Sequence, residues 1–160
     1  MIRSAREFTR LYQDLLRVRF VTGGRDPATG LDCLGVVQVY LSRVRASVPA
    51  EAFPLDLPGS ADGIMGWLEG EAAKWWEFVG DSPHSAILAG DVVLSMQGKT
   101  RSLPHVAVLC YPATPKLLLS ASKHSGVFTL PLERAEQHGA ILGVYRLRYE
   151  ALPPARTRAA

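Results

Sequence analysis

The chain lacks the features that define several large classes of protein. It has two cysteines, Cys33 and Cys110, which are too few for a disulfide framework. It has no apolar run of about 18 residues, so no membrane span is expected. The N-terminus is charged and amphipathic and has no signal-peptide core, so we expect any export to use another route, such as assembly into a particle or release by lysis.

Motifs for metal, phosphate and serine chemistry are also missing. No pair of cysteines or histidines has C-x-x-C or H-E-x-x-H spacing, and we expect neither a metal nor a cofactor. No phosphate-binding glycine loop follows a strand, and no G-x-S-x-G elbow presents a serine. The net charge of +3 is mild, and the basic residues are not interleaved with aromatic ones, so no nucleic-acid partner is expected.

What is present predicts one globular domain. The composition is 48% hydrophobic and 21% charged, and 160 residues are enough for a real core. We place the domain at 1–150. The tail at 151–160, with Pro153, Pro154 and two arginines, is expected to be flexible or ordered by a partner.

Hydrophobic periodicity predicts helices first and strands afterwards. Ser4 and Glu7 form a capping-box pair at the start of the first helix. After Gly80 the period changes to that of an antiparallel meander, with Gly143 as a possible bulge, so the fold class is α+β. The helical segments are Ser4–Leu16, one that starts at Cys33, Asp62–Val79 and Leu132–His138; the strands are Val92–Ser95, His105–Tyr111, Lys116–Ser122, Val127–Leu130 and Ala140–Tyr149.

The segment 62–79 carries all three tryptophans, Trp67, Trp75 and Trp76. They form either a surface that stacks on sugars or docks a partner, or one side of the core. The core interpretation is favoured.

Cys33 begins the most regular amphipathic segment of the chain. The apolar residues from Cys33 to Val44 follow the spacing of a core-facing helix, and Asp32 is a good N-cap. In the first turn, the peptide dipoles lower the pKa of a thiol and the N–H groups can receive an oxyanion. Position alone equally allows a small apolar side chain in the core.

A cysteine nucleophile needs a base, and the chain offers four histidines. His84 and His138 have polar neighbours, and His124 lies in a predicted turn, so all three suit the surface. His105 opens an apolar strand in which it shares a face with Ala107 and Leu109, while Cys110 lies on the opposite face and is expected in the core.

Four stretches in this order carry a resemblance to a known family: FVTGG-x₆-LDCLGVV, AGDVVL, PHVAVL and LLLSAS-x₃-GV. Together they resemble the NlpC family of papain-like cell-wall cysteine peptidases, and are most similar to the versions encoded in phage tail modules. The resemblance covers about Phe20 to Val127, and the final GVYRL is similar to the closing strand of the phage forms. It implies a papain-like fold, in which the helix that carries the nucleophile packs on a small antiparallel sheet.

The resemblance also implies a nucleophile at Cys33, a base at His105, and a polar residue on the next strand that orients the imidazole. This third position is commonly histidine in the family, but here it is Ser120, with His124 as the rival. A tyrosine that helps at the oxyanion site in many members is Phe20 here.

The function that the resemblance implies is hydrolysis of a peptide bond in the peptidoglycan stem. The expected partners are the stem peptide and phage tail-tip or hub proteins, and the expected location is the tail tip of a virion or a related injection particle. Two alternatives stay open: a structural tail hub that keeps the peptidase fold, and an acyltransferase with the same cysteine and histidine.

Overall fold

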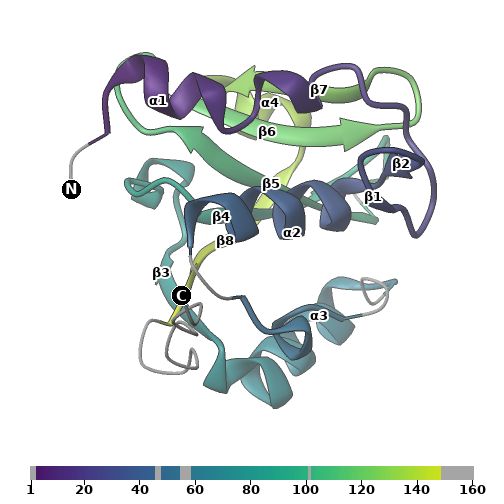
Figure 1. Ribbon diagram of the computed structural model, residues 1–160. Coiled ribbons are helices and arrows are strands. Elements are labelled where there is room, and N and C mark those ends of the chain that lie inside the picture. Colours follow the sequence, from purple (N-terminus) through teal and green to yellow (C-terminus); the bar gives the residue numbers. More distant parts are fainter. Residues whose placement is uncertain (1–2, 46–47, 55–58, 101, 149–160) are drawn as a thin grey trace, which may run out of the picture.

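The computed structural model describes residues 3–45, 48–54, 59–100 and 102–148, so the predicted tail at 151–160 lies outside the described residues. Within these ranges, helices and a six-stranded antiparallel sheet confirm the α+β class (Figure 1). None of the helices in the described ranges has the length and apolar character that crossing a membrane requires. The α-helices are α1 (Ala5–Arg10), α2 (Cys33–Val44), α3 (Ala61–Glu69) and α4 (Ala135–His138).

The large sheet has the strand order β3-β8-β4-β5-β6-β7. Strands β4 to β7 form the predicted meander, but β8 returns to lie between β3 and β4. The alternation of apolar and polar residues along a strand shows which side chains share a face, but not which strands are neighbours. The sequence pattern therefore could not predict the position of β8. The strands are β3 (Trp76–Gly80), β4 (Val92–Gln97), β5 (Leu103–Tyr111), β6 (Leu117–Ser122), β7 (Gly126–Pro131) and β8 (Ala140–Leu147), and a separate hairpin pairs β1 (Arg25–Asp26) with β2 (Gly30–Leu31).

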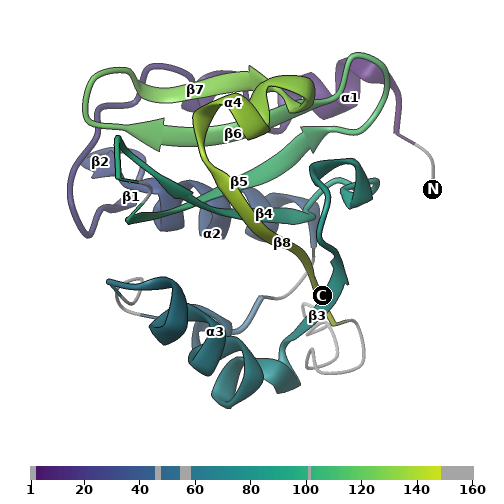
Figure 2. The ribbon, with the colours of Figure 1, turned by 180° about the vertical axis from the view of Figure 1, so that it is seen from behind.

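The two faces of the sheet are covered differently. Figure 1 shows α2 along the front face, and Figure 2 shows the short α4 behind the sheet. Val106, Val108 and Cys110 of β5 join the front core with α2, while Ala107 and Leu109 join a smaller rear core. The predicted alternation of β5 is therefore confirmed, and Cys110 is a core residue.

The first predicted helix, Ser4–Leu16, is wrong in its second half. The capping box of Ser4 and Glu7 is present, but α1 ends at Arg10 and a 3-10 turn, η1 (Gln13–Leu15), follows. Arg43 of α2 donates to the carbonyl of Leu11 and pairs with Asp14. This tertiary contact occupies the Leu11 carbonyl, which a continuous α-helix would offer to the N–H of Leu15.

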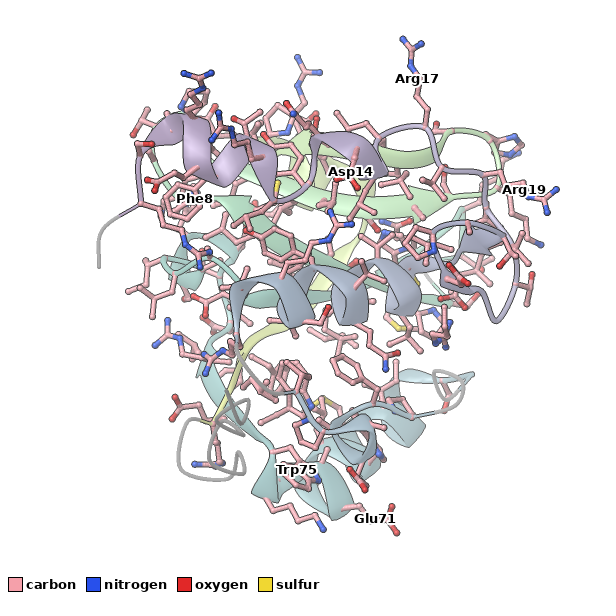
Figure 3. The ribbon with its side chains drawn as sticks, viewed as in Figure 1. Phe8, Asp14, Arg17, Arg19, Glu71 and Trp75 are labelled. Carbon is pink, nitrogen blue, oxygen red and sulfur yellow. The ribbon has the colours of Figure 1, made fainter. Side chains whose placement is uncertain are left out.

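The predicted helix Asp62–Val79 also ends early. Helix α3 stops at Gly70, a 3-10 turn η3 (Glu71–Lys74) follows, and Trp76 begins the edge strand β3. The indole N–H of Trp76 donates to the carbonyl of Ala52 at 2.7 Å, and Trp67 and Trp75 pack against the same core. Figure 3 shows Trp75 beside η3. The tryptophans therefore serve the core, as favoured from the sequence.

Gly143 marks an irregularity in β8, as the sequence suggested. Leu94 pairs with Gly143 and Ser95 pairs with Ile141, so β8 has one more residue than β4 here. Such a bulge bends the strand locally.

Strands β5 and β6 separate near the start of β5. The paired residues run from Tyr111 with Leu117 to Val108 with Leu119. Beyond that pair, Val106 has no strand partner on β6 in the described register. The N–H and C=O of Leu109 bond to the residues before β4, so by alternation the N–H and C=O of Val106 point toward β6. We call this the β5–β6 seam: the gap beside Val106 where side chains replace the backbone ladder.

Candidate active site

Asp32 organises the start of α2. One carboxylate oxygen accepts the N–H of Gly35 at 2.8 Å, which is the predicted N-cap bond. The other accepts the N–H of Gly23 at 3.0 Å, and Arg25 pairs with the same carboxylate. The loop that carries Gly23, Gly24 and Arg25 is thus tied to the first turn of α2, where Cys33 lies.

Gly35 lets this loop lie directly against the helix. A Cβ atom at position 35 would lie 2.1 Å from the carbonyl oxygen of Gly24, a separation that real side chains do not adopt. The N–H of Asp32 donates to the same Gly24 oxygen at 3.3 Å. The glycine that follows Cys33 in the D-C-x-G motif therefore has a steric role.

The pKa of Cys33 contradicts the expectation from the helix dipole. Burial raises the pKa of the thiol above its ordinary value, and the charge of Asp32 adds to the rise. The backbone N–H groups of Val106, Leu34 and Cys33 itself lower the pKa, but they do not offset burial. The sequence pattern gave no measure of this desolvation, and the resting group is a neutral thiol.

His105 and Ser120 form the hydrogen bond expected of a base and its orienting residue. Ser120 Oγ lies 2.8 Å from His105 Nε2, and it also donates to the carbonyl of Val106 at 2.8 Å. A serine hydroxyl has one proton, and a carbonyl oxygen can only accept, so Nε2 carries the proton that the serine oxygen accepts. The lone pair of the neutral ring is then on Nδ1.

The β5–β6 seam brings Cys33 and His105 to one peptide unit. Cys33 approaches from the face covered by α2, and its sulfur lies near the N–H of Val106. Ser120 approaches from the other face and takes the carbonyl of the same residue. His105 directly precedes Val106 in β5. The thiol and the imidazole therefore lie on opposite faces of the sheet, next to the same peptide at the β5–β6 seam.

The other histidines differ in their surroundings. His84 lies exposed in the 3-10 turn η4 (Pro83–Ser85), and His138 ends α4. His124 is exposed in the β6–β7 turn and lines the same pocket as His105. Ser120, the candidate for the third position on the strand, bonds to the imidazole at 2.8 Å.

His105 faces an open pocket of about 460 Å³ behind the sheet, which we call the rear chamber. Its floor comes from β4 to β7, and η5 (Leu132–Arg134) and α4 border it. The chamber lies on the face of the sheet opposite α2, so a molecule bound there contacts the imidazole of His105 and not the helix. Its polar lining residues are Ser95, Gln97, His105, Ser120, Ser122, His124, Ser125 and Arg134.

A small apolar cavity of about 40 Å³ lies on the front side, between α2, α3 and the sheet. Leu34 and Val106, whose N–H groups neighbour the Cys33 sulfur, both line it. Aromatic rings, including those of Trp67 and Tyr145, close its far side. Cys33 thus lies where an apolar pocket and the seam meet.

The sequence interpretation missed Ser95, which is buried and pairs across the strands with His105. The signal was available, because Ser95 and Gln97 interrupt the apolar run of β4 at alternate positions. Phe20 is half-buried against the core and bridges Leu31, and it offers no hydroxyl, as its sequence implied. In the described ranges, no three His, Cys, Asp or Glu side chains gather as metal ligands do.

Nine chains of solved structures resemble this chain in fold. No family model matches the chain, and no curated protein matches it. A crystal structure from Staphylococcus aureus, described as similar to lipoprotein of the NLP/P60 family, aligns with a TM-score of 0.47 and 17% identity. The alignment covers 93% of this chain but 44% of that one, so this chain spans less than half of its length.

Proposed function

We propose that this chain is a cysteine peptidase or amidase that cleaves amide bonds in the stem peptide of bacterial peptidoglycan. The observation that carries the proposal is the meeting of Cys33, His105 and Ser120 at the Val106 peptide. The motif order D-C-x-G, G-D-V-V and H-V-x-V, which resembles that of the NlpC peptidases, supports the substrate class.

Acyl transfer follows from the roles that these groups can take. Cys33 attacks the amide carbon, and the N–H groups of Cys33 and Leu34 in the first turn face the developing oxyanion. His105 accepts the thiol proton at Nδ1 and passes it to the leaving amine. It then activates a water that cleaves the thioester and releases the acid, with the thiol restored.

Ser120 holds the imidazole in the tautomer that this mechanism needs. Because Nε2–H donates to Ser120 Oγ, the basic lone pair is on the nitrogen that is free of this bond to Ser120. A neutral hydroxyl stabilises the imidazolium less than a carboxylate does. We therefore expect a modest turnover. Cys33 starts the reaction as a neutral thiol.

The setting that we propose is a phage tail tip or a related injection particle acting at the cell wall. The similarity of the motifs and of the closing strand sequence to phage tail versions supports this setting. In it, tail-tip or hub proteins are the assembly partners.

The test is mass analysis of purified murein after incubation with the full chain. Loss of cross-linked or full-length stem peptides, with one new amine per cleaved bond, is expected for the wild type and not for Cys33→Ala. Intact murein from several bacterial cell-wall types, or equal hydrolysis by a correctly folded Cys33→Ala, contradicts the proposal.

A structural hub is the second candidate, because large apolar side chains are exposed. Phe78 on the edge strand β3 is 59% exposed, and Leu103 at the start of β5 is 63% exposed. Apolar groups in such places are suited to protein contacts. Normal particle assembly with Cys33→Ala, but not with Phe78→Ser, combined with inactivity of the wild type on murein, favours the hub.

A further inference from the structure

We propose that the rear chamber is a subsite for an anionic group, carboxylate or phosphate, on the leaving part of the substrate, and that Arg134 recognises it. The subsite rests on the proposed function, because it is assigned to the fragment that His105 protonates. The chamber is lined by His105 and Ser120, so the imidazole opens into it. A fragment that receives a proton from His105 therefore departs on this side.

The charge of the chamber favours an anion. Arg134 is a permanent cation at its border, and no Asp or Glu is among the chamber's described lining residues. The ion pairs of the described residues join Arg25, Arg43 and Arg146 to carboxylates, and Arg134 is in none of them. Its guanidinium is exposed and can present parallel N–H groups to a carboxylate or phosphate.

The remaining lining supplies hydrogen bonds and a floor. Ser122, Ser125 and His124 lie around the β6–β7 turn, and Gln97 ends β4. The floor is apolar, with Val93, Ala107, Leu118 and Ile141 among its residues. An apolar floor surrounded by convergent polar groups is suited to a small ligand. The chamber's volume of about 460 Å³ accommodates a dipeptide-sized fragment.

The test measures binding to the full chain with Cys33→Ala, so it does not depend on hydrolysis. The probes are alanyl-alanine, its neutral counterpart alanyl-alaninamide, and inorganic phosphate, each titrated while amide resonances are followed by NMR. We expect alanyl-alanine to bind at least about fivefold more tightly than the amide, because a charge-assisted bond to arginine is lost with the carboxylate. The shifts should fall on β4, the β6–β7 turn and η5.

Arg134→Gln should remove this preference, and Arg17→Gln is the matched control. Arg17 is an exposed arginine outside the chamber, and Figure 3 shows it pointing away from the molecule. Phosphate binding that displaces alanyl-alanine, or phosphate binding alone at these residues, supports the subsite and tells which anion it prefers. Equal binding of the amide, a preference that survives Arg134→Gln, or no shift in the chamber with either anion overturns the inference.

The murein assay with wild-type protein separates this result from the proposed function. Anion binding in the chamber without murein hydrolysis refutes the peptidase and leaves the chamber as an anion site that holds no leaving group. Hydrolysis without anion binding refutes the subsite alone.

Discussion

Ser120 Oγ accepts the Nε2 proton of His105 at 2.8 Å while giving its own proton to the Val106 carbonyl. This arrangement fixes one tautomer of the imidazole with a side chain that carries no charge. It predicts a small effect on turnover when Ser120 is removed.

Ser120→Ala should lower kcat on murein by about tenfold or less, because one neutral hydrogen bond contributes about 1 kcal/mol. Ser120→His introduces the residue that is commoner at this position of the family and should keep or raise kcat. His124→Ala is the control, since His124 lines the chamber and Ser120 is the residue bonded to the ring. Loss of activity in His124→Ala alone would assign the orienting role to His124.

His105→Ala should abolish hydrolysis, because the proposed mechanism passes the thiol proton of Cys33 through the imidazole that adjoins the Val106 peptide. The measurement is the rate of stem-peptide release under equal protein concentration. His84→Ala is the matched control on an exposed turn and should stay within a few-fold of wild type. The reverse pattern would overturn the placement of the base.

Cys33 should be alkylated well before Cys110, because Cys33 is half-buried and Cys110 is fully buried. The raised pKa of Cys33 also sets a pH dependence. Its thiolate fraction, and so its alkylation rate, should keep rising above pH 9.0, the ordinary value of the group. Mass spectrometry of iodoacetamide-treated protein measures both, and equal labelling of the two thiols or a rate that is flat from pH 5 to 9 contradicts the prediction.

Gly35→Ala should destabilise the fold by about 1–3 kcal/mol, because the new methyl group meets the Gly24 carbonyl and the loop must move. Gly66→Ala is the matched control in α3, where a Cβ meets nothing within 4 Å. It should stabilise the helix by about 0.5–1 kcal/mol. Urea unfolding of both variants gives the comparison, and equal shifts would disprove the close approach at Gly35.

Cys110 should lower the free energy of unfolding at alkaline pH. Burial raises its pKa to about 12 from the ordinary value of 9.0. The native state therefore holds a proton that the unfolded chain releases between these values, and stability falls as pH rises through this window. The contribution to the slope is about 1.4 kcal/mol per pH unit.

The measurement is the free energy of unfolding of wild type and Cys110→Ala between pH 8.5 and 11. The variant starts from a lower stability because of the cavity, but its slope should be shallower. Parallel curves would show that Cys110 ionises normally in the folded protein.

Much of this protein was determined by local sequence. The Asp32 cap and the apolar spacing from Cys33 predicted α2, and both are present because they depend on contacts within the segment and its own first turn. The alternation of β5 predicted that His105 and Cys110 lie on opposite faces, since successive strand side chains must alternate. The capping box at Ser4 formed for the same local reason.

Tertiary structure decided what depends on distant partners. Arg43 reached Leu11 and Asp14 and ended the first helix early, and pairing with β8 drew Trp76 into a strand. The raised pKa of Cys33 comes from the packing of α2 on the sheet, which removes water from the thiol whatever the helix dipole offers. The candidate site depends on the separation of β5 and β6 at Val106. No alternation pattern describes this gap, because a pattern gives the faces of a strand and not the path of its neighbour.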